Sequence, residues 1–196
     1  MDLRYWIFDM DGTLTVPVHD FNNIKQRLGL AEDQALLTSM MALPEPERAM
    51  AFKVVGEWEE SLAKTASANP DALALLDCLT QKQARIGVLT RNRRDLIEVT
   101  LSAAGILEFV DPDSLLGREC ATPKPAPDGV LAICNHWGVE PEKAIMVGDH
   151  YDDIEAGLRA GCLTVHILRG NGPVHPNTIT CTDLRQLIPF IQQRHQ

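Results

Sequence analysis

The sequence predicts an α/β fold with a parallel sheet of about five strands and a small helical insertion after the first strand. Short apolar runs recur along the 196-residue chain, each followed by turn residues, and helical patterns separate most of them. Strands that alternate with helices form parallel sheets joined by right-handed crossovers. Between the first two apolar runs the pattern is helical only, which predicts an insertion there.

The core elements follow one another in a regular order. The predicted strands span residues 4–8, 85–89, 114–117, 144–147 and 162–167. The first of them holds the bulky run from Tyr5 to Phe8, which is typical of a strand buried on both faces. The predicted core helices span residues 71–83, 93–104, 127–137 and 152–160, and the last three stop at a glycine. A loop over 169–180 and a terminal helix over 183–193, which we expect to cover the sheet edge, complete the chain.

Residues 15–68 form the helical insertion, with predicted helices at 21–28, 32–41 and 45–64. Gly29 and the segment Leu43-Pro44-Glu45-Pro46 separate these helices, because glycine and proline interrupt them. Residues 1–14 and 69–196 form the predicted core. Both chain crossings lie beside the first strand, so we expect the insertion to be a lid over the carboxyl edge of the sheet. A passive helical extension is the alternative.

Composition and charge limit the classes of partner. Hydrophobic residues make up 45% of the chain, which predicts a folded globular protein. A net charge of -9 argues against binding to nucleic acid or to an anionic membrane, since both need dense Lys and Arg. No apolar run reaches the length that spans a bilayer. The five cysteines lack the spacing of a zinc site or a disulfide framework, so we expect reduced thiols in a cytoplasmic protein.

An acidic motif follows the first strand directly. Asp9-Met10-Asp11-Gly12-Thr13 begins where that strand ends, at the rim of the sheet where such folds bind ligands. Two carboxylates one residue apart can ligate a hard cation, attack an electrophile and transfer a proton. Gly12 permits a sharp exit from the strand. An acidic turn that only closes the strand is the alternative.

Two weaker motifs occur further along the chain. Thr90 and Asn92 follow the strand at 85–89, just ahead of a helix N-terminus, where a hydroxyl, an amide and backbone N–H groups can bind a phosphate oxygen. Helix capping is the alternative for this motif. Lys124 stands between Pro123 and Pro125, which hold the backbone extended and fix the direction of the ammonium. A rigid ammonium suits a dianionic group, and a solvated lysine is the alternative.

The last motif is acidic and again follows a buried strand. Gly148-Asp149-His150-Tyr151-Asp152-Asp153 holds carboxylates that repel one another unless a cation or a lysine compensates. Asp149 is therefore the predicted metal ligand, and Asp153 is the predicted partner of Lys124. Asp152 is expected to stabilise the next helix through the helix dipole. All these motifs fall at the carboxyl ends of predicted parallel strands, which favours a functional site.

Asp9-x-Asp11-Gly-Thr, Thr90, Lys124-Pro and Gly148-Asp149-x-x-x-Asp153 together resemble the motifs of the haloacid dehalogenase-like hydrolase superfamily. The place of the insertion resembles the helical-cap subgroup, which includes phosphoglycolate phosphatases and β-phosphoglucomutases. The resemblance implies a Rossmann-like three-layer core, Mg²⁺ as the cofactor and an aspartyl-phosphate intermediate. It thus implies a Mg²⁺-dependent phosphomonoester hydrolase that acts on a small phosphorylated metabolite.

The resemblance also implies a role for each motif residue. Asp9 would be the nucleophile and a Mg²⁺ ligand, and Asp11 would be the general acid and base, with its backbone carbonyl on the metal. Thr90 and Lys124 would bind the phosphoryl group, which we expect Asn92 to contact as well; Asp149 would ligate Mg²⁺, and Asp153 would orient Lys124 or a metal-bound water. A carboxylate that attacks a phosphoryl dianion meets like-charge repulsion, which Mg²⁺ and Lys124 would offset.

Two features depart from the family pattern. Thr15-Val16-Pro17 stands where many relatives carry an acidic residue, so the substrate is not assigned by analogy. His19 and Asp20, at the entrance of the insertion, belong to no shared motif. They could contact a substrate, while a hinge or a helix cap is the alternative for Asp20. The other histidines show no metal-site spacing.

Other functions stay open. A phosphomutase shares the core residues and differs in how the insertion protects the aspartyl-phosphate from water. A 2-haloacid dehalogenase would use Asp9 without a metal and needs neither Asp11 nor the acidic loop at 148–153. A non-catalytic binding module has no need to keep a nucleophile and an acid together. The oligomeric state is left open.

Overall fold

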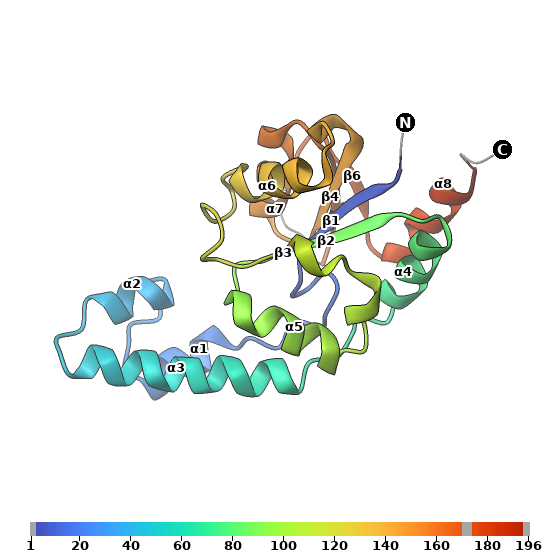
Figure 1. The fold of residues 1–196 in the computed structure, drawn as a ribbon. Helices are drawn as coiled ribbons and strands as arrows, with labels where there is room; N and C mark the ends of the chain where they lie inside the picture. The colour runs from blue at the N-terminus through green and yellow to red at the C-terminus, as the bar shows by residue number, and fades with distance from the viewer. Residues whose placement is uncertain (1–2, 170–173, 194–196) are drawn as a thin grey trace.

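The computed structural model describes residues 3–169 and 174–193, and in this part of the chain a parallel sheet carries helices on both faces (Figure 1). Its strands are β1 (Tyr5–Phe8), β2 (Arg85–Leu89), β3 (Leu115–Leu116), β4 (Ala144–Gly148), β5 (Leu163–Ile167) and β6 (Ile179–Cys181). They lie in the order β3-β2-β1-β4-β5-β6, and each neighbouring pair is parallel. The predicted α/β fold is confirmed. The chain reverses its direction across the sheet at β1, where such sheets bind ligands.

Helices separate the strands from β1 to β5, with a longer run of helices after β1. They are α1 (Phe21–Arg27), α2 (Leu36–Met41), α3 (Glu47–Lys64), α4 (Ala72–Gln81), α5 (Arg94–Ala103), α6 (Asp128–Trp137), α7 (Tyr151–Ala160) and α8 (Ile188–Gln193). Short 3₁₀ turns are η1 (Leu107–Phe109), η2 (Pro112–Ser114), η3 (Pro141–Lys143) and η4 (Leu184–Leu187). Across the described residues, no helix has both the length and the apolar composition that crossing a bilayer requires.

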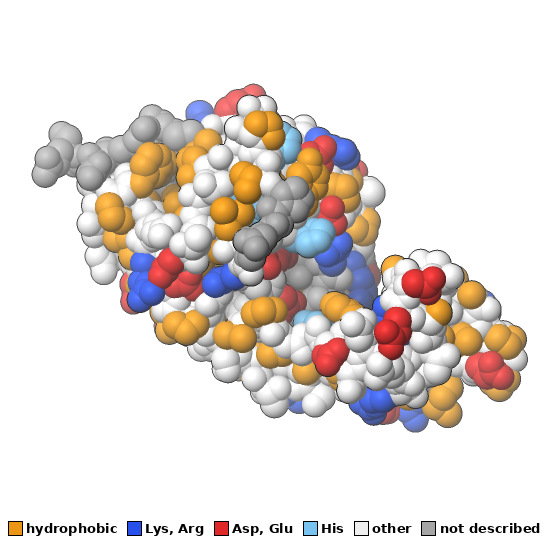
Figure 2. Space-filling model, turned by 180° about the vertical axis from the view of Figure 1, so that it is seen from behind, with side chains coloured by type: hydrophobic (Ala, Val, Ile, Leu, Met, Phe, Trp, Pro, Cys, Tyr) orange, Lys and Arg blue, Asp and Glu red, His pale blue; other side chains and the backbone are white. Residues whose placement is uncertain are grey.

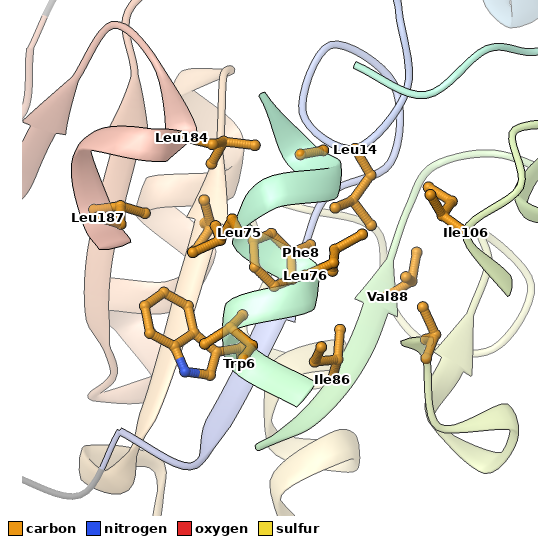
Figure 3. Close-up of a cluster of buried hydrophobic side chains, with 14 of the residues drawn as sticks. Trp6, Phe8, Leu14, Leu75, Leu76, Ile86, Val88, Ile106, Leu184 and Leu187 are labelled. Carbon is orange, nitrogen blue, oxygen red and sulfur yellow. The ribbon is translucent and has the colours of Figure 1, made fainter. Parts of the chain in front are cut away.

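The side chains of β1 alternate between two buried layers. Trp6 and Phe8 pack with α4 and the C-terminal segment, in the cluster that Figure 3 shows. Ile7 points to the opposite face, where α6 and α7 cover the sheet. All three side chains are almost inaccessible to solvent, as expected for a central strand. This rigid double-sided packing fixes the carboxyl end of β1, where Asp9 lies.

The helices α1, α2 and α3 project from the core (Figure 1). They share a small hydrophobic cluster of their own, formed by Ile24, Met40, Ala51 and Val55. Helix α3 also lies along α5. Ion pairs join α3 to the core, with Glu59 2.9 Å from Arg118 and Glu60 3.7 Å from Arg93.

Two expectations about the C-terminal part need correction. The loop predicted over 169–180 extends outside the described residues at 170–173, and its end belongs to β6, a short edge strand. The helix predicted over 183–193 is divided into η4 and α8. Pro189 lies in the first turn of α8, and its missing N–H cannot continue a helix from the preceding turn.

The second helix of the insertion begins later than predicted. Residues 32–35 precede α2 as turn and bend, although the prediction placed them in a helix over 32–41. The buried Lys25 ammonium donates to the carbonyl oxygens of Glu32 at 2.6 Å and Gln34 at 3.1 Å. These carbonyls turn toward a buried charge, so they are not available for a helical ladder.

Candidate active site

The predicted site residues come together at the carboxyl edge of the sheet. Asp9 and Asp11 follow β1, Thr90 follows β2, and Asp149 follows β4, while Lys124 precedes α6. Strands β2, β1 and β4 are neighbours, so the loops after them meet at one place. The carboxyl ends of parallel strands lie at one edge of the sheet, so residues that are far apart in the sequence come into contact there.

A buried lysine joins two of the predicted carboxylates. The Lys124 ammonium lies 2.5 Å from Asp9 Oδ1 and 2.6 Å from Asp153 Oδ1, and it also donates to the Leu89 carbonyl oxygen at 2.8 Å. Each of its three protons therefore has an acceptor in the protein. Both Lys124 and Asp153 are almost completely buried. The second Asp153 oxygen accepts from the His150 backbone N–H at 3.0 Å. Asp153 thus holds both the lysine and the loop that carries Asp149.

Asp149 is held by the loop that follows β1. The Thr13 hydroxyl donates to Asp149 Oδ1 at 3.0 Å. Gly12 has a φ of 85°, and a Cβ there would lie 2.3 Å from Asp149 Oδ2. A Cβ on Gly148 would likewise lie 2.3 Å from Asp153 Oδ2. Both glycines are therefore required by the close approach of the acidic side chains to the backbone.

Asp11 points to a different set of partners. Its carboxylate accepts from Asn92 Nδ2 at 2.6 Å and from the Thr15 hydroxyl at 3.1 Å. The His19 ring lies 3.8 Å away, packed against Phe21 and Trp58 of the insertion. Asn92, predicted as a phosphate contact, is thus placed on the Asp11 carboxylate.

Thr90 lies at the end of β2, and a backbone N–H group holds its hydroxyl. Its hydroxyl oxygen accepts from the Asn92 backbone N–H at 3.2 Å, and Thr90 is buried. That hydrogen bond uses a lone pair of the oxygen and leaves the hydroxyl proton available to donate.

The acidic cluster carries more negative charge than Lys124 compensates. Burial raises the pKa of Asp9 to about 7. Lys124 lowers this pKa, while the nearby Asp153 and Asp149 raise it. Burial also raises the pKa of Asp149, although the Thr13 hydrogen bond opposes the change. Burial disfavours the Lys124 ammonium, but Asp9 and Asp153 outweigh it and raise the lysine pKa. Another cation would stabilise the ionised carboxylates.

The cluster offers ligands suited to such a cation. One oxygen from each of Asp9, Asp149 and Asp153 lies within 4.8 Å of the others. Lys124 and the His150 N–H occupy both oxygens of Asp153, whereas Asp9 Oδ2 and Asp149 Oδ2 have no hydrogen-bond donor among the described residues. Carboxylate oxygens are the ligands that Mg²⁺ prefers, so Asp9 and Asp149 fit a hard divalent ion.

These residues line a cleft of ≈ 310 Å³ between the core and the insertion. Its walls include Asp9, Asp11, Thr90, Lys124 and Asp149 from the core. Glu59, Phe21 and His19 close it from the side of the insertion. Figure 2 shows the surface indented where the projecting helices meet the core. The cleft is large enough for a phosphoryl group with part of a bound molecule.

Several contacts in the site have no clear signal in the sequence. Thr13 belongs to the first motif, but its hydrogen bond to Asp149 depends on the neighbouring strand. His19 approaches Asp11 after a turn in which the Thr15 N–H donates to the Met10 carbonyl oxygen at 2.9 Å. Asp20 has one of the roles considered for it, since its carboxylate accepts from the Asn23 N–H at 2.9 Å and caps α1. Asp152 pairs with Arg91 at 2.9 Å.

Known proteins resemble this chain over most of its length. A family model for haloacid dehalogenase-like hydrolases matches residues 4–161. A haloacid dehalogenase-like hydrolase domain-containing protein of Arabidopsis thaliana is 31% identical over 93% of this chain and 78% of its own length. The validoxylamine A 7'-phosphate phosphatase of Streptomyces hygroscopicus subsp. limoneus is 32% identical over 81% of this chain and 83% of its own length.

Among solved structures, a predicted phosphoglycolate phosphatase from Haemophilus somnus superposes with a TM-score of 0.79. It is 22% identical, and the match covers 96% of this chain and 97% of that one. A doubly wound parallel sheet with clustered aspartates at its carboxyl edge is typical of α/β proteins that bind their ligands at that edge. The chain belongs to the haloacid dehalogenase-like hydrolase family, which has phosphatases among its members.

Proposed function

We propose that this protein is a Mg²⁺-dependent phosphomonoester hydrolase that acts on a small phosphorylated metabolite through an aspartyl-phosphate. The observation that carries the proposal is the position of Asp9. One of its oxygens is held by Lys124 at 2.5 Å, and the other has no hydrogen-bond donor among the described residues, while Asp9 belongs to the acidic cluster that lines the cleft. A carboxylate fixed in this way is oriented for attack on a phosphorus atom.

Each residue of the site then has its own role in the proposed reaction. A carboxylate oxygen of Asp9 attacks phosphorus while the bond from phosphorus to the ester oxygen breaks, and Asp11 gives its proton to the departing alkoxide. Thr90 donates to a phosphoryl oxygen, and Lys124 donates to another with the proton that it directs at Asp9 before the phosphoryl group binds. Asp11 next takes a proton from water, whose oxygen attacks phosphorus and releases the Asp9 carboxylate. Asp9 and Asp149, with the backbone carbonyl of Asp11, would hold Mg²⁺, which offsets negative charge on the transferring group.

We further propose that residues 15–68 act as a cap on a catalytic core of residues 1–14 and 69–196. The two chain crossings lie side by side, because Thr15 pairs with Ala68 and the Asn69 N–H donates to the Leu14 carbonyl at 2.8 Å. The separate hydrophobic cluster of α1, α2 and α3 supports the same division. A unit joined to the core through two adjacent chain segments can close over the cleft and exclude water.

A simple assay tests the proposed function. The purified protein is incubated with phosphorylated metabolites and p-nitrophenyl phosphate, and both free phosphate and isomerised product are measured. We expect free phosphate with Mg²⁺, its loss after chelation and its return when Mg²⁺ is restored. Isomerised product without free phosphate would establish the phosphomutase instead. Halide release from 2-haloacids without metal, or no turnover of any kind, would contradict the phosphatase.

A further inference from the structure

A second cavity adjoins the cleft on the side of the insertion. It has a volume of ≈ 580 Å³ and lies between the projecting helices and the core. Phe21, Glu59, Arg91 and Arg118 line both the cavity and the cleft, so the two spaces adjoin at these side chains. The cavity is therefore the space next to a phosphoryl group bound in the cleft.

The walls that the insertion contributes to this cavity are largely apolar. They come from Phe21 of α1, from Leu36, Leu37 and Met40 of α2, and from Phe52 and Val55 of α3. Leu37 is 61% exposed and Phe52 is 42% exposed, so large apolar side chains remain in contact with solvent at this site. Apolar surface of this kind is stabilised when an apolar ligand covers it.

The charged side chains of the cavity are already paired within the protein. Arg91 lies 2.9 Å from Asp152, and Arg118 lies 2.9 Å from Glu59. Arg93 lies 2.5 Å from Asp95 and 3.7 Å from Glu60. An anionic group that entered the cavity would share these guanidinium groups with carboxylates that already bind them. The pairing thus weakens the attraction of the cavity for a second negative charge.

We propose that the substrate is a phosphomonoester whose leaving group is a bulky, uncharged alcohol with an aliphatic or aromatic face, bound against Leu37 and Phe52. This inference rests on the proposed phosphatase function and adds the class of its substrate. The cavity is much larger than a two-carbon acid requires, and its size is that of pockets for drug-sized ligands. Leu37 and Phe52 then determine specificity without touching the reacting atoms.

The test compares alkyl phosphates whose leaving alkoxides have similar basicity. We expect kcat/KM for 2-phenylethyl phosphate to exceed that for ethyl phosphate by about tenfold or more, as filling a hydrophobic pocket commonly does. We also expect 2-phosphoglycolate, which adds a negative charge, to be a poorer substrate than 2-phenylethyl phosphate. Equal kcat/KM values for 2-phenylethyl and ethyl phosphate, or a preference for 2-phosphoglycolate, would overturn the inference while leaving the phosphatase in place.

Matched variants separate leaving-group binding from packing of the insertion. Leu37→Ser and Phe52→Ser are expected to lower the ratio of the two alkyl phosphate kcat/KM values by about tenfold, mainly through KM. Met50→Ser is the control, because Met50 is 61% exposed on the same helix as Phe52 and does not line the cavity. A ratio that is unchanged in Leu37→Ser and Phe52→Ser would overturn the assignment. Absence of phosphate release from every ester in the wild type would instead reject the proposed function.

Discussion

Asp9→Asn is expected to lose phosphatase activity by roughly 10⁴-fold or more, as enzymes do when a covalent nucleophile is removed. The amide keeps the size of the side chain but lacks the negative charge that attacks phosphorus. It also replaces one of the carboxylates, Asp9 and Asp149, whose unpaired oxygens suit a cation. The measurement is the rate of phosphate release from p-nitrophenyl phosphate with Mg²⁺ present.

The loss should arise from chemistry and not from unfolding. Lys124 keeps Asp153 and the Leu89 carbonyl as partners, so the thermal midpoint of Asp9→Asn should stay close to that of the wild type. Asp77→Asn, an exposed aspartate on α4, serves as the matched control and should keep wild-type activity. Activity of Asp9→Asn within a few-fold of that control would show that another group is the nucleophile.

Lys124→Ala is expected to lose both turnover and stability. The substitution leaves Asp9 and Asp153 buried next to each other without their shared cation, and breaking a buried ion pair lowers the free energy of unfolding by about 3–5 kcal/mol. Turnover falls because the phosphoryl group loses an ammonium where negative charge gathers. Vanadate, a phosphate mimic, should bind more weakly. Chemical denaturation, kinetics and vanadate inhibition measure the three effects.

Lys124→Arg separates the loss of turnover from the loss of stability. This variant keeps the positive charge between the carboxylates, so it should be more stable than Lys124→Ala. The planar guanidinium differs in shape from an ammonium and cannot place single protons on Asp9, Asp153 and the Leu89 carbonyl in the same way. We expect turnover to fall by about 10²-fold or more. Wild-type kinetics in both Lys124→Ala and Lys124→Arg would show that Lys124 does not act on the phosphoryl group.

The sheet and its motifs could be predicted from local patterns. Continuous apolar runs such as Trp6 to Phe8 indicate strands buried on both faces, and the structure confirms this burial. Once the strands are parallel, their carboxyl ends share one edge, so Asp9, Thr90 and Asp149 were expected to meet. Strand β6 gives a weaker signal, because three residues at the edge of a sheet are too few for a periodic pattern.

Contacts between the insertion and the core could not be predicted in this way. Glu59 and Arg118 are 59 residues apart, and nothing in either local sequence points to the other. The same holds for His19 beside Asp11, which depends on the turn between Met10 and Thr15. The late start of α2 follows from the burial of Lys25, a tertiary effect that overrides helix propensity.

The most direct test of the account is the structure of the protein with Mg²⁺ and beryllofluoride, a mimic of a phosphoryl group on a carboxylate. We expect the adduct on an Asp9 oxygen, with Lys124 and Thr90 donating to its fluorides and Mg²⁺ held by Asp9 and Asp149. An adduct on another residue, or Mg²⁺ bound away from Asp9 and Asp149, would contradict the account.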